Sequence, residues 1–204
     1  MPKIVDHDRR RRELAQAIWS IIALRGLSAV TLRSVAAEAG VSMGTVQHYF
    51  RTKDQMLLFA CQHMVDLAQA GASSLLEKSH HPDEPESIIR AVMHQTLPVD
   101  EQQRFGSAVW LAFVAHAIVD DELAEIIRHA WSGLHDILTN QLRAAQQFGK
   151  VSDDVDVERE ALSLATVADG LVQHAVVGQI SADDALAVID HHLNRLFAKP
   201  SYRA

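Results

Sequence analysis

The residues with the clearest chemical potential lie in the stretch TLRSVAAEAGVSMGTVQHYF, residues 31–50. In its second half Thr45, Gln47 and His48 carry hydroxyl, amide and imidazole groups, which are long enough to reach base edges or phosphates of duplex DNA. Gly44 beside them lets a helix backbone approach DNA closely. DNA recognition is one interpretation. The alternative is a helical hairpin at a surface, whose polar side chains are solvated.

The spacing of the same stretch fits a helix-turn-helix. Two helices that cross steeply need a small residue at the crossing, and Ala36 meets this requirement. Their tight turn needs a residue that tolerates a positive φ, which is Gly40. The second helix would then keep one face free for the major groove. Apolar residues at the offsets needed to pin both helices to a core are Val35, Ala39, Val41, Val46 and either Tyr49 or Phe50.

The flanking residues suit contacts to the DNA backbone. Ser42 and the first amides of the second helix can hold a phosphate. Arg9 to Arg12 can add charge from an N-terminal arm, which raises affinity without sequence specificity. The predicted DNA-contact residues are Thr31, Arg33, Ser42, Met43, Gly44, Thr45, Gln47, His48, Tyr49 and Lys53.

Charge is distributed unevenly along the 204 residues. The formal net charge of −7 alone argues against a nucleic-acid partner. Residues 1–55, however, carry nine Lys/Arg and five Asp/Glu, whereas residues 56–204 carry ten and twenty-one. A basic head on an acidic body indicates a local site for a polyanion.

Nearly all of the chain has the periodicity of helices, so we predict an all-α fold with about nine helices. Predicted helix starts include Thr31, Ser42, the pair Thr52 and Gln55, and the pair Ser181 and Asp184, each with capping chemistry. We assign residues 1–52 to a three-helix DNA-binding domain and residues 53–204 to a helical ligand-binding and dimerisation domain. The predicted helices span residues 8–25, 32–39, 43–49, 53–77, 86–97, 101–118, 121–147, 156–177 and 182–197.

Residues 10–57 resemble the N-terminal domain of the tetracycline-repressor (TetR) family of bacterial transcriptional regulators. The resemblance rests on TLRSVAAEAGVSMGTVQHYF, on the aromatic pair that closes the second helix, and on RTKDQML after it. It implies binding to double-stranded operator DNA. The family usually has a tyrosine at the position of Gln47, so which of Gln47, His48 and Tyr49 contacts bases and which contacts phosphate stays open.

The C-terminal stretches DVEREALSLATVADGLVQHAVVGQIS and ADDALAVIDHHLNRLF are similar to the last two helices of the choline-responsive (BetI-like) branch. The resemblance implies a homodimer in which these helices pair with their copies. An ordinary intramolecular core is the alternative. The predicted interface residues are Leu162, Ala165, Ala168, Val172, Ala175, Leu186, Ile189, Leu193 and Leu196.

A small-molecule effector of unknown identity is expected in the body. For each aromatic residue, core packing is the alternative to a pocket. Asp169 is costly inside an apolar helix unless it is paired. It could pair with a histidine, face the dimer interface or meet a cation, and the resemblance favours a quaternary ammonium or polyamine. The candidate lining residues are Met64, Phe105, Trp110, Phe113, His116, Trp131, Leu134, His135, Leu138, Asp169 and His174.

Other functional classes find little support. None of the twelve histidines lie three or four apart, so we expect no metal site, and no motif indicates a cofactor or an enzyme. The single Cys61 fits a reducing cytoplasm, and we expect neither a signal peptide nor a membrane span. Release of DNA would follow from movement of the long helix that begins at Lys53. A regulator without a ligand, an activator, or a helical enzyme or scaffold remain alternatives.

Overall fold

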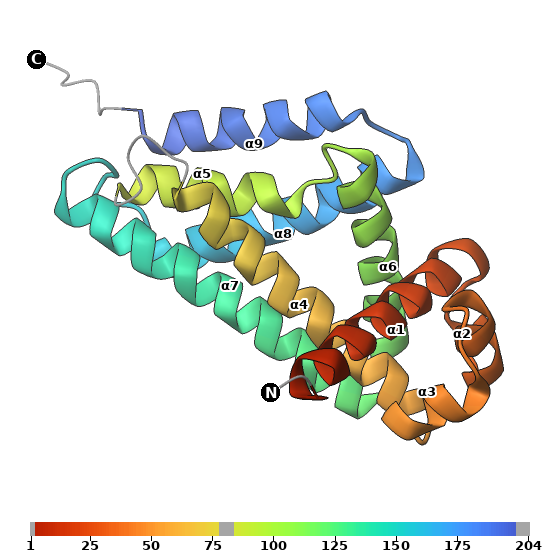
Figure 1. The fold of residues 1–204 in the computed structure, drawn as a ribbon. Helices are drawn as coiled ribbons and strands as arrows, with labels where there is room; N and C mark the ends of the chain where they lie inside the picture. Colours follow the sequence, from red (N-terminus) through yellow and green to blue (C-terminus); the bar gives the residue numbers. More distant parts are fainter. Residues whose placement is uncertain (1–2, 78–83, 199–204) are drawn as a thin grey trace, which may run out of the picture. The chain divides into compact units, whose positions relative to one another are not determined.

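The computed structural model describes residues 3–77 and 84–198, and in these ranges all regular structure is helical (Figure 1). This confirms the all-α prediction and its helix number for the described chain. The elements are α1 (Lys3–Arg25), a 3-10 turn η1 (Leu27–Ala29), α2 (Leu32–Glu38), α3 (Met43–Tyr49), α4 (Lys53–Glu77), α5 (Pro85–Thr96), α6 (Glu101–Ala117), α7 (Asp121–Gln147), α8 (Val157–Val177) and α9 (Ala182–Leu196).

The start of α1 differs most from the predicted boundary, because the helix begins at Lys3 rather than near residue 8. Apolar periodicity could not reveal these first turns, since residues 7–13 contain no apolar side chain and the first buried apolar residue of the described side chains is Leu14. Polar pairs support the helix there instead. The guanidinium of Arg10 lies 2.6 Å from the carboxylate of Glu13, and that of Arg9 lies 3.8 Å from it.

Side-chain caps fix the short helices where the sequence places them. Thr31 and Ser34 form a reciprocal capping box at the start of α2, and Ser42 accepts a hydrogen bond from the amide of Thr45. Ser181 and Asp184 form the expected box at α9, and these hydrogen bonds hold the pKa of Asp184 below its ordinary value. Such caps satisfy amides that a helix N-terminus leaves without partners.

The cap before α4 is shifted by one residue from the predicted box. The hydroxyl of Thr52 accepts a hydrogen bond from the amide of Gln55, as expected. The side chain of Gln55, however, accepts from the amide of Arg51 at 2.8 Å. The start of α4 is therefore joined directly to the residue that follows the α3 C-cap.

The chain divides into two compact units. The first unit runs to Leu67 and includes Ala108–Arg128, and its core is formed by α1, α2, α3 and parts of α4, α6 and α7. Burial of each large apolar side chain stabilises such a core by roughly 1.5–3 kcal/mol. Its largest fully buried side chains include Leu14, Ile18, Ile21, Phe50, Met56, Leu57, Phe113, Leu123 and Ile127.

The second unit comprises Ala68–Ser107 and the chain from His129, and α5, α8 and α9 pack against one another in it. Arg90 of α5 bridges Glu86 on its own helix and Asp190 and Asn194 on α9. Arg104 donates hydrogen bonds of 2.6 Å to the last carbonyls of α8. Side chains thus tie α6 and α5 to the terminal helices.

The helices α4, α6 and α7 contribute residues to both units. The boundaries of the packing units therefore differ from the predicted domain boundary between residues 52 and 53. The functional division at that point concerns what each part binds, and it stays a prediction.

Gly40 provides a test of the turn between α2 and α3. It has a φ of 64°, a left-handed conformation that costs L-residues about 1–2 kcal/mol. We expect Gly40→Ala to lower the free energy of unfolding by about 1 kcal/mol in urea denaturation. Gly106→Ala is the control, because this helical glycine has open space around an added Cβ. Its substitution should stabilise the protein by roughly 0.5–1 kcal/mol. Equal effects of the two substitutions would contradict this account.

Candidate nucleic-acid interface

The turn between α2 and α3 has the geometry of a helix-turn-helix. Ala36 is buried where the two helices meet, and its carbonyl accepts a 3.0 Å hydrogen bond from the amide of Val41. Gly40 reverses the chain between them. Val46 and Phe50 are both buried and anchor one side of α3 to the core of the first unit. The opposite side of α3 is left without cover from this unit.

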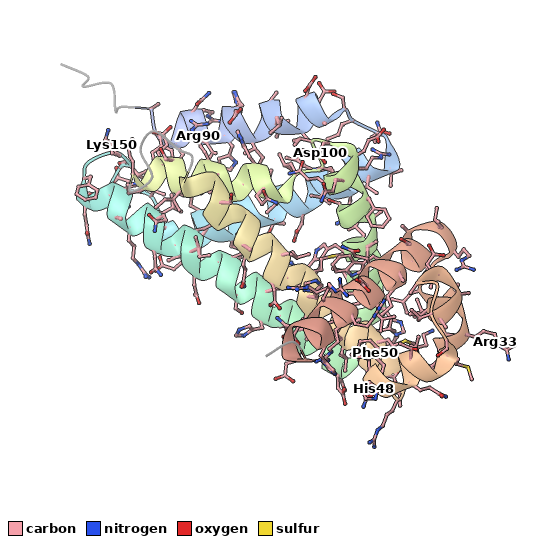
Figure 2. All side chains as sticks on the ribbon, in the orientation of Figure 1. Arg33, His48, Phe50, Arg90, Asp100 and Lys150 are labelled. Atoms are coloured by element: carbon pink, nitrogen blue, oxygen red, sulfur yellow. The ribbon has the colours of Figure 1, made fainter. Side chains whose placement is uncertain are left out.

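The uncovered side of α3 carries the polar residues singled out in the sequence. Met43, Gly44, Gln47 and His48 are exposed, and Thr45 is half-buried. Figure 2 shows His48 pointing outward from α3, whereas Phe50 turns inward. Only one side of this seven-residue helix is buried in the core. The polar groups on its other side are therefore available to a hydrogen-bonding partner.

The flanking candidates lie at the starts of α2, α3 and α4. Ser42, at the N-terminus of α3, shares a 2.9 Å hydrogen bond with the hydroxyl of Thr45. Thr31 and Arg33 are exposed at the start of α2, and Arg33 extends away from it in Figure 2. Lys53, half-buried, begins α4. All ten predicted DNA-contact residues lie in the first unit, and their role in DNA binding stays a prediction.

Tyr49 has an aromatic neighbour on another helix. Its ring centroid lies 4.6 Å from that of His7 on α1 and 5.1 Å from that of His48. His7 was not predicted to belong to this site, since only tertiary packing brings the first turns of α1 to the end of α3. The one available signal was the spacing of His7 and Arg11, which places them on one helical face.

A second aromatic group joins α1 to α4. Trp19 donates a 3.1 Å hydrogen bond to the carbonyl of Ala60, and its ring stacks on that of His63. The ring of Phe59 also stacks on that of His63, with centroids 5.9 Å apart. Burial lowers the pKa of His63, with a smaller opposing effect of Asp66. His63 is thus held by packing rather than by charge.

The candidate pocket residues are divided between the two units. In the first unit, Phe113 is fully buried in the core, Met64 and Trp110 pack against it, and His116 lies 3.7 Å from Asp120. In the second unit, Leu138 is fully buried, Leu134 and His135 are half-buried, and Phe105, Trp131 and His174 are exposed. Phe113 and Leu138 are therefore core residues of their own units. The role of the whole set stays a prediction.

His135, Thr139 and Asp169 in the second unit carry buried or half-buried polar groups that have no partner in the described ranges. The Nδ1 atom of His135 and the hydroxyl of Thr139 are buried, one turn apart on α7, without a hydrogen bond. Asp169 on α8 is half-buried and has no hydrogen-bond or ion-pair partner in the described chain, so of the three alternatives for it, pairing with a histidine is not seen. Burial raises the pKa of Asp169. Unpaired groups of this kind gain most from a ligand or partner that supplies the missing bond.

A surface hollow of about 400 Å³ lies at the turn from α7 to α8, lined by Gln146, Gly149, Val151, Ser152, Asp153 and Asp154. It contains none of the candidate pocket residues, so it has no bearing on the predicted effector site.

The candidate dimer residues fall into two groups. Ala168, Val172, Ala175, Ile189 and Leu193 are buried within the single chain, because α5, α8 and α9 pack together. These five residues therefore belong to an intramolecular core. The group that retains accessible surface is Leu162, at 60% exposure, with Ala165, Leu186 and Leu196 partly exposed.

The described ranges also bear on metal binding, membrane insertion and thiol chemistry. No group of three His, Cys, Asp or Glu residues there could hold a metal ion. No described helix is both long and apolar enough to cross a membrane. Burial raises the pKa of the Cys61 thiol to about 12, which leaves it protonated and unreactive near neutral pH.

Family comparisons match both parts of the chain. Residues 14–59 match bacterial regulatory proteins of the tetR family, and residues 85–198 match the C-terminal domain of BetI-type transcriptional repressors. Among curated proteins, the chain is 29% identical to the transcriptional regulator BetI of Brucella suis, with 98% of both chains covered. It is 27% identical to the regulator PksA of Bacillus subtilis, covering 96% of this chain and 94% of that protein.

Solved structures share the fold. A transcriptional regulator from Rhodococcus is 29% identical, with a TM-score of 0.79 over 91% of this chain and 95% of that chain. A regulator from Saccharomonospora viridis, solved in complex with choline, is 23% identical, with a TM-score of 0.83 over 92% of this chain and 96% of that chain. The second likeness concerns the fold alone.

Replacement of Gln47 by alanine tests whether α3 contacts bases. The Gln47 side chain is exposed, and an amide can bind adenine through two hydrogen bonds worth about 1–3 kcal/mol of discrimination. We expect Gln47→Ala to weaken binding to DNA from upstream of the gene roughly 5- to 100-fold, with little change for a scrambled duplex. Fluorescence anisotropy at one stated salt concentration measures both.

The control is Gln62→Ala, which removes an exposed glutamine that bonds Asp66 on α4. An equal loss on both duplexes would assign Gln47 to a phosphate contact instead.

Proposed function

The chain belongs to the TetR family of bacterial transcriptional regulators and carries a BetI-type repressor domain, and we propose that it acts as a homodimeric repressor. The proposed dimer binds a pseudo-palindromic operator and releases it when a small organic cation binds to the body. We assign it no catalytic role and place its action in the cytoplasm, where operator DNA is found.

The observation that carries the proposal is the uncovered polar face of α3. The helix is anchored by Val46 and Phe50, so its orientation is fixed while Gln47 and His48 remain exposed. A rigid element that presents such groups suits major-groove recognition. The cationic flank supplied by Arg33 and Lys53 supports attraction to the DNA backbone.

The homodimer is proposed from the terminal helices. Apolar side chains remain exposed there, including Leu162 on α8 and Val188 on α9, with 60% and 46% exposure. Pairing with a second copy would cover them. A twofold dimer also presents two α3 helices, which can occupy successive major grooves about 34 Å apart.

The proposed effector class is a small cation. Asp169 supplies a half-buried carboxylate that has no counter-ion among the described residues, and aromatic rings such as Trp131 can bind a cation through their faces. The similarity to BetI proteins and the choline complex of the Saccharomonospora viridis regulator make choline the first compound to test.

The proposed coupling runs through α4. This helix begins four residues after the last residue of α3 and contributes to both compact units. A cation that binds one arrangement of the body more tightly would shift the equilibrium toward it. If that arrangement changes the separation of the two α3 helices, the affinity for an operator with fixed spacing falls.

Operator binding and assembly can be measured together. We expect gel shifts with DNA from upstream of the gene, weakened steeply between 50 and 200 mM salt because phosphate contacts release counterions. Sedimentation at micromolar concentration should show a dimer. A monomer under these conditions would contradict the homodimer, and absence of salt-dependent binding to any duplex would contradict the function.

Titration calorimetry tests the cation. Choline should bind, while its neutral isostere 3,3-dimethylbutan-1-ol should not, because only the cation compensates the charge of Asp169. We expect Asp169→Asn to weaken choline binding at least tenfold, and Asp136→Asn, at an exposed position on α7, to leave it unchanged.

The pH dependence follows from the raised pKa of Asp169. A cation favours the ionised carboxylate, so its affinity should fall as the pH decreases through that pKa. Asp169→Asn should lack this dependence. Equal affinity for choline and its neutral isostere would exclude the cationic class.

A further inference from the structure

The four consecutive arginines in the first turns of α1 have different environments. Arg9 and Arg10 both lie near the carboxylate of Glu13, at 3.8 and 2.6 Å. Arg12 is exposed. Arg11 is half-buried, and its guanidinium lies over aromatic rings rather than beside a carboxylate. The structure thus separates one arginine from a run that the sequence presents as uniform.

The guanidinium of Arg11 is held by two phenylalanines. Its central carbon lies 4.2 Å from the ring centroid of Phe59 and 5.6 Å from that of Phe50. The two rings contact each other, with centroids 5.4 Å apart. Phe50 is the C-cap of α3, and Phe59 belongs to α4, so Arg11 touches both elements that border the proposed interface.

The hydrogen-bonding groups of Arg11 find no acceptor among the described residues. Its Nε atom is buried without an acceptor. Its terminal nitrogens have no acceptor in the described chain and are not among the enclosed atoms, so they reach the surface. A guanidinium that is partly desolvated yet unpaired is poised for an anion, since charge-assisted hydrogen bonds would replace those lost to burial.

The position of Arg11 relative to α3 indicates which anion. One turn earlier on the same face of α1, His7 lies 4.6 Å from Tyr49 and 6.2 Å from His48, between ring centroids. This face of α1 therefore borders the C-terminal end of α3, where the predicted DNA contacts Tyr49 and His48 lie. The anion that the proposed function brings to this place is a DNA phosphate.

We propose that Arg11 binds a phosphate of the DNA backbone, with its guanidinium plane set by the rings of Phe50 and Phe59. The terminal N–H groups donate to the phosphate oxygens, and the rings reduce the freedom that the side chain would lose on binding. This inference rests on the proposed DNA binding. It assigns a specific contact outside α3 to Arg11, which lies within α1 rather than in the N-terminal arm expected from the sequence.

Salt dependence distinguishes a phosphate contact from a structural role. Binding to a labelled duplex of scrambled sequence is measured by anisotropy from 50 to 300 mM NaCl, so no operator need be known. We expect Arg11→Met to reduce the slope of log Kd against log salt by about 0.9, the value for one phosphate contact. Affinity at 100 mM salt should fall roughly tenfold, equally for scrambled and upstream DNA.

Two variants complete the comparison. Arg11→Lys keeps the charge, so it should retain most of the slope but lose several-fold in affinity, because an ammonium lacks the planar fork. Arg12→Met removes the exposed neighbouring charge and should change the slope by less than about 0.3, since a diffuse charge releases few counterions. Circular dichroism confirms folding, and Arg11→Gln replaces Arg11→Met if the latter does not fold.

Each possible result of these measurements either supports or overturns the proposed phosphate contact. An unchanged slope in a folded Arg11 variant overturns the proposal, even if affinity falls, because a merely structural residue would behave in that way. Equal slope changes for the Arg11 and Arg12 variants also overturn it, since they would indicate diffuse attraction. Absence of DNA binding by the unmodified protein refutes the proposed function itself. A slope reduced only in the Arg11 variant supports the contact.

Discussion

The anchoring of α3 by two buried side chains is the constraint on which the rest of the site depends. Seven residues are too few for a helix to be stable alone, because nucleation costs more than so short a segment recovers. Ser42 satisfies an amide at its start, while Val46 and Phe50 fix one side in the core. The remaining side is necessarily exposed, and it is there that hydrogen-bonding groups are concentrated.

Phe50 extends this constraint beyond α3. Its ring contacts Phe59 on α4 and lies under the guanidinium of Arg11 on α1. The end of α3 therefore cannot shift without disturbing the neighbouring helices, because closely packed interiors transmit displacement. A single buried aromatic residue in this way joins the exposed face to the long helix that contributes to both units.

The second unit combines an apolar core with polar side-chain bonds between its helices. Ile89, Ile189 and Leu193 are fully buried where α5 meets α9, and beside them Arg90 is satisfied by three acceptors. Asp169 is different, because no partner in the part of the chain that the structure describes compensates its burial. A half-buried carboxylate that costs stability persists most readily where a ligand or partner uses it.

The sequence by itself determined the helices and much of the nucleic-acid interface. Periodicity, glycines and capping pairs such as Ser181 with Asp184 are local, and local hydrogen bonds and backbone preferences fix where helices begin and end. The polar face of α3 was predictable for the same reason, since the residues that anchor it and those it exposes lie within one short stretch.

Tertiary structure decided which residues from distant segments meet. Only packing places His7 beside Tyr49, Arg11 over Phe59, and five of the apolar residues of α8 and α9 inside their own chain. One-dimensional periodicity shows that a face is apolar, but it does not show what covers that face. Contact between residues far apart in sequence depends on how whole helices pack, and this follows from the shapes of all the buried side chains together.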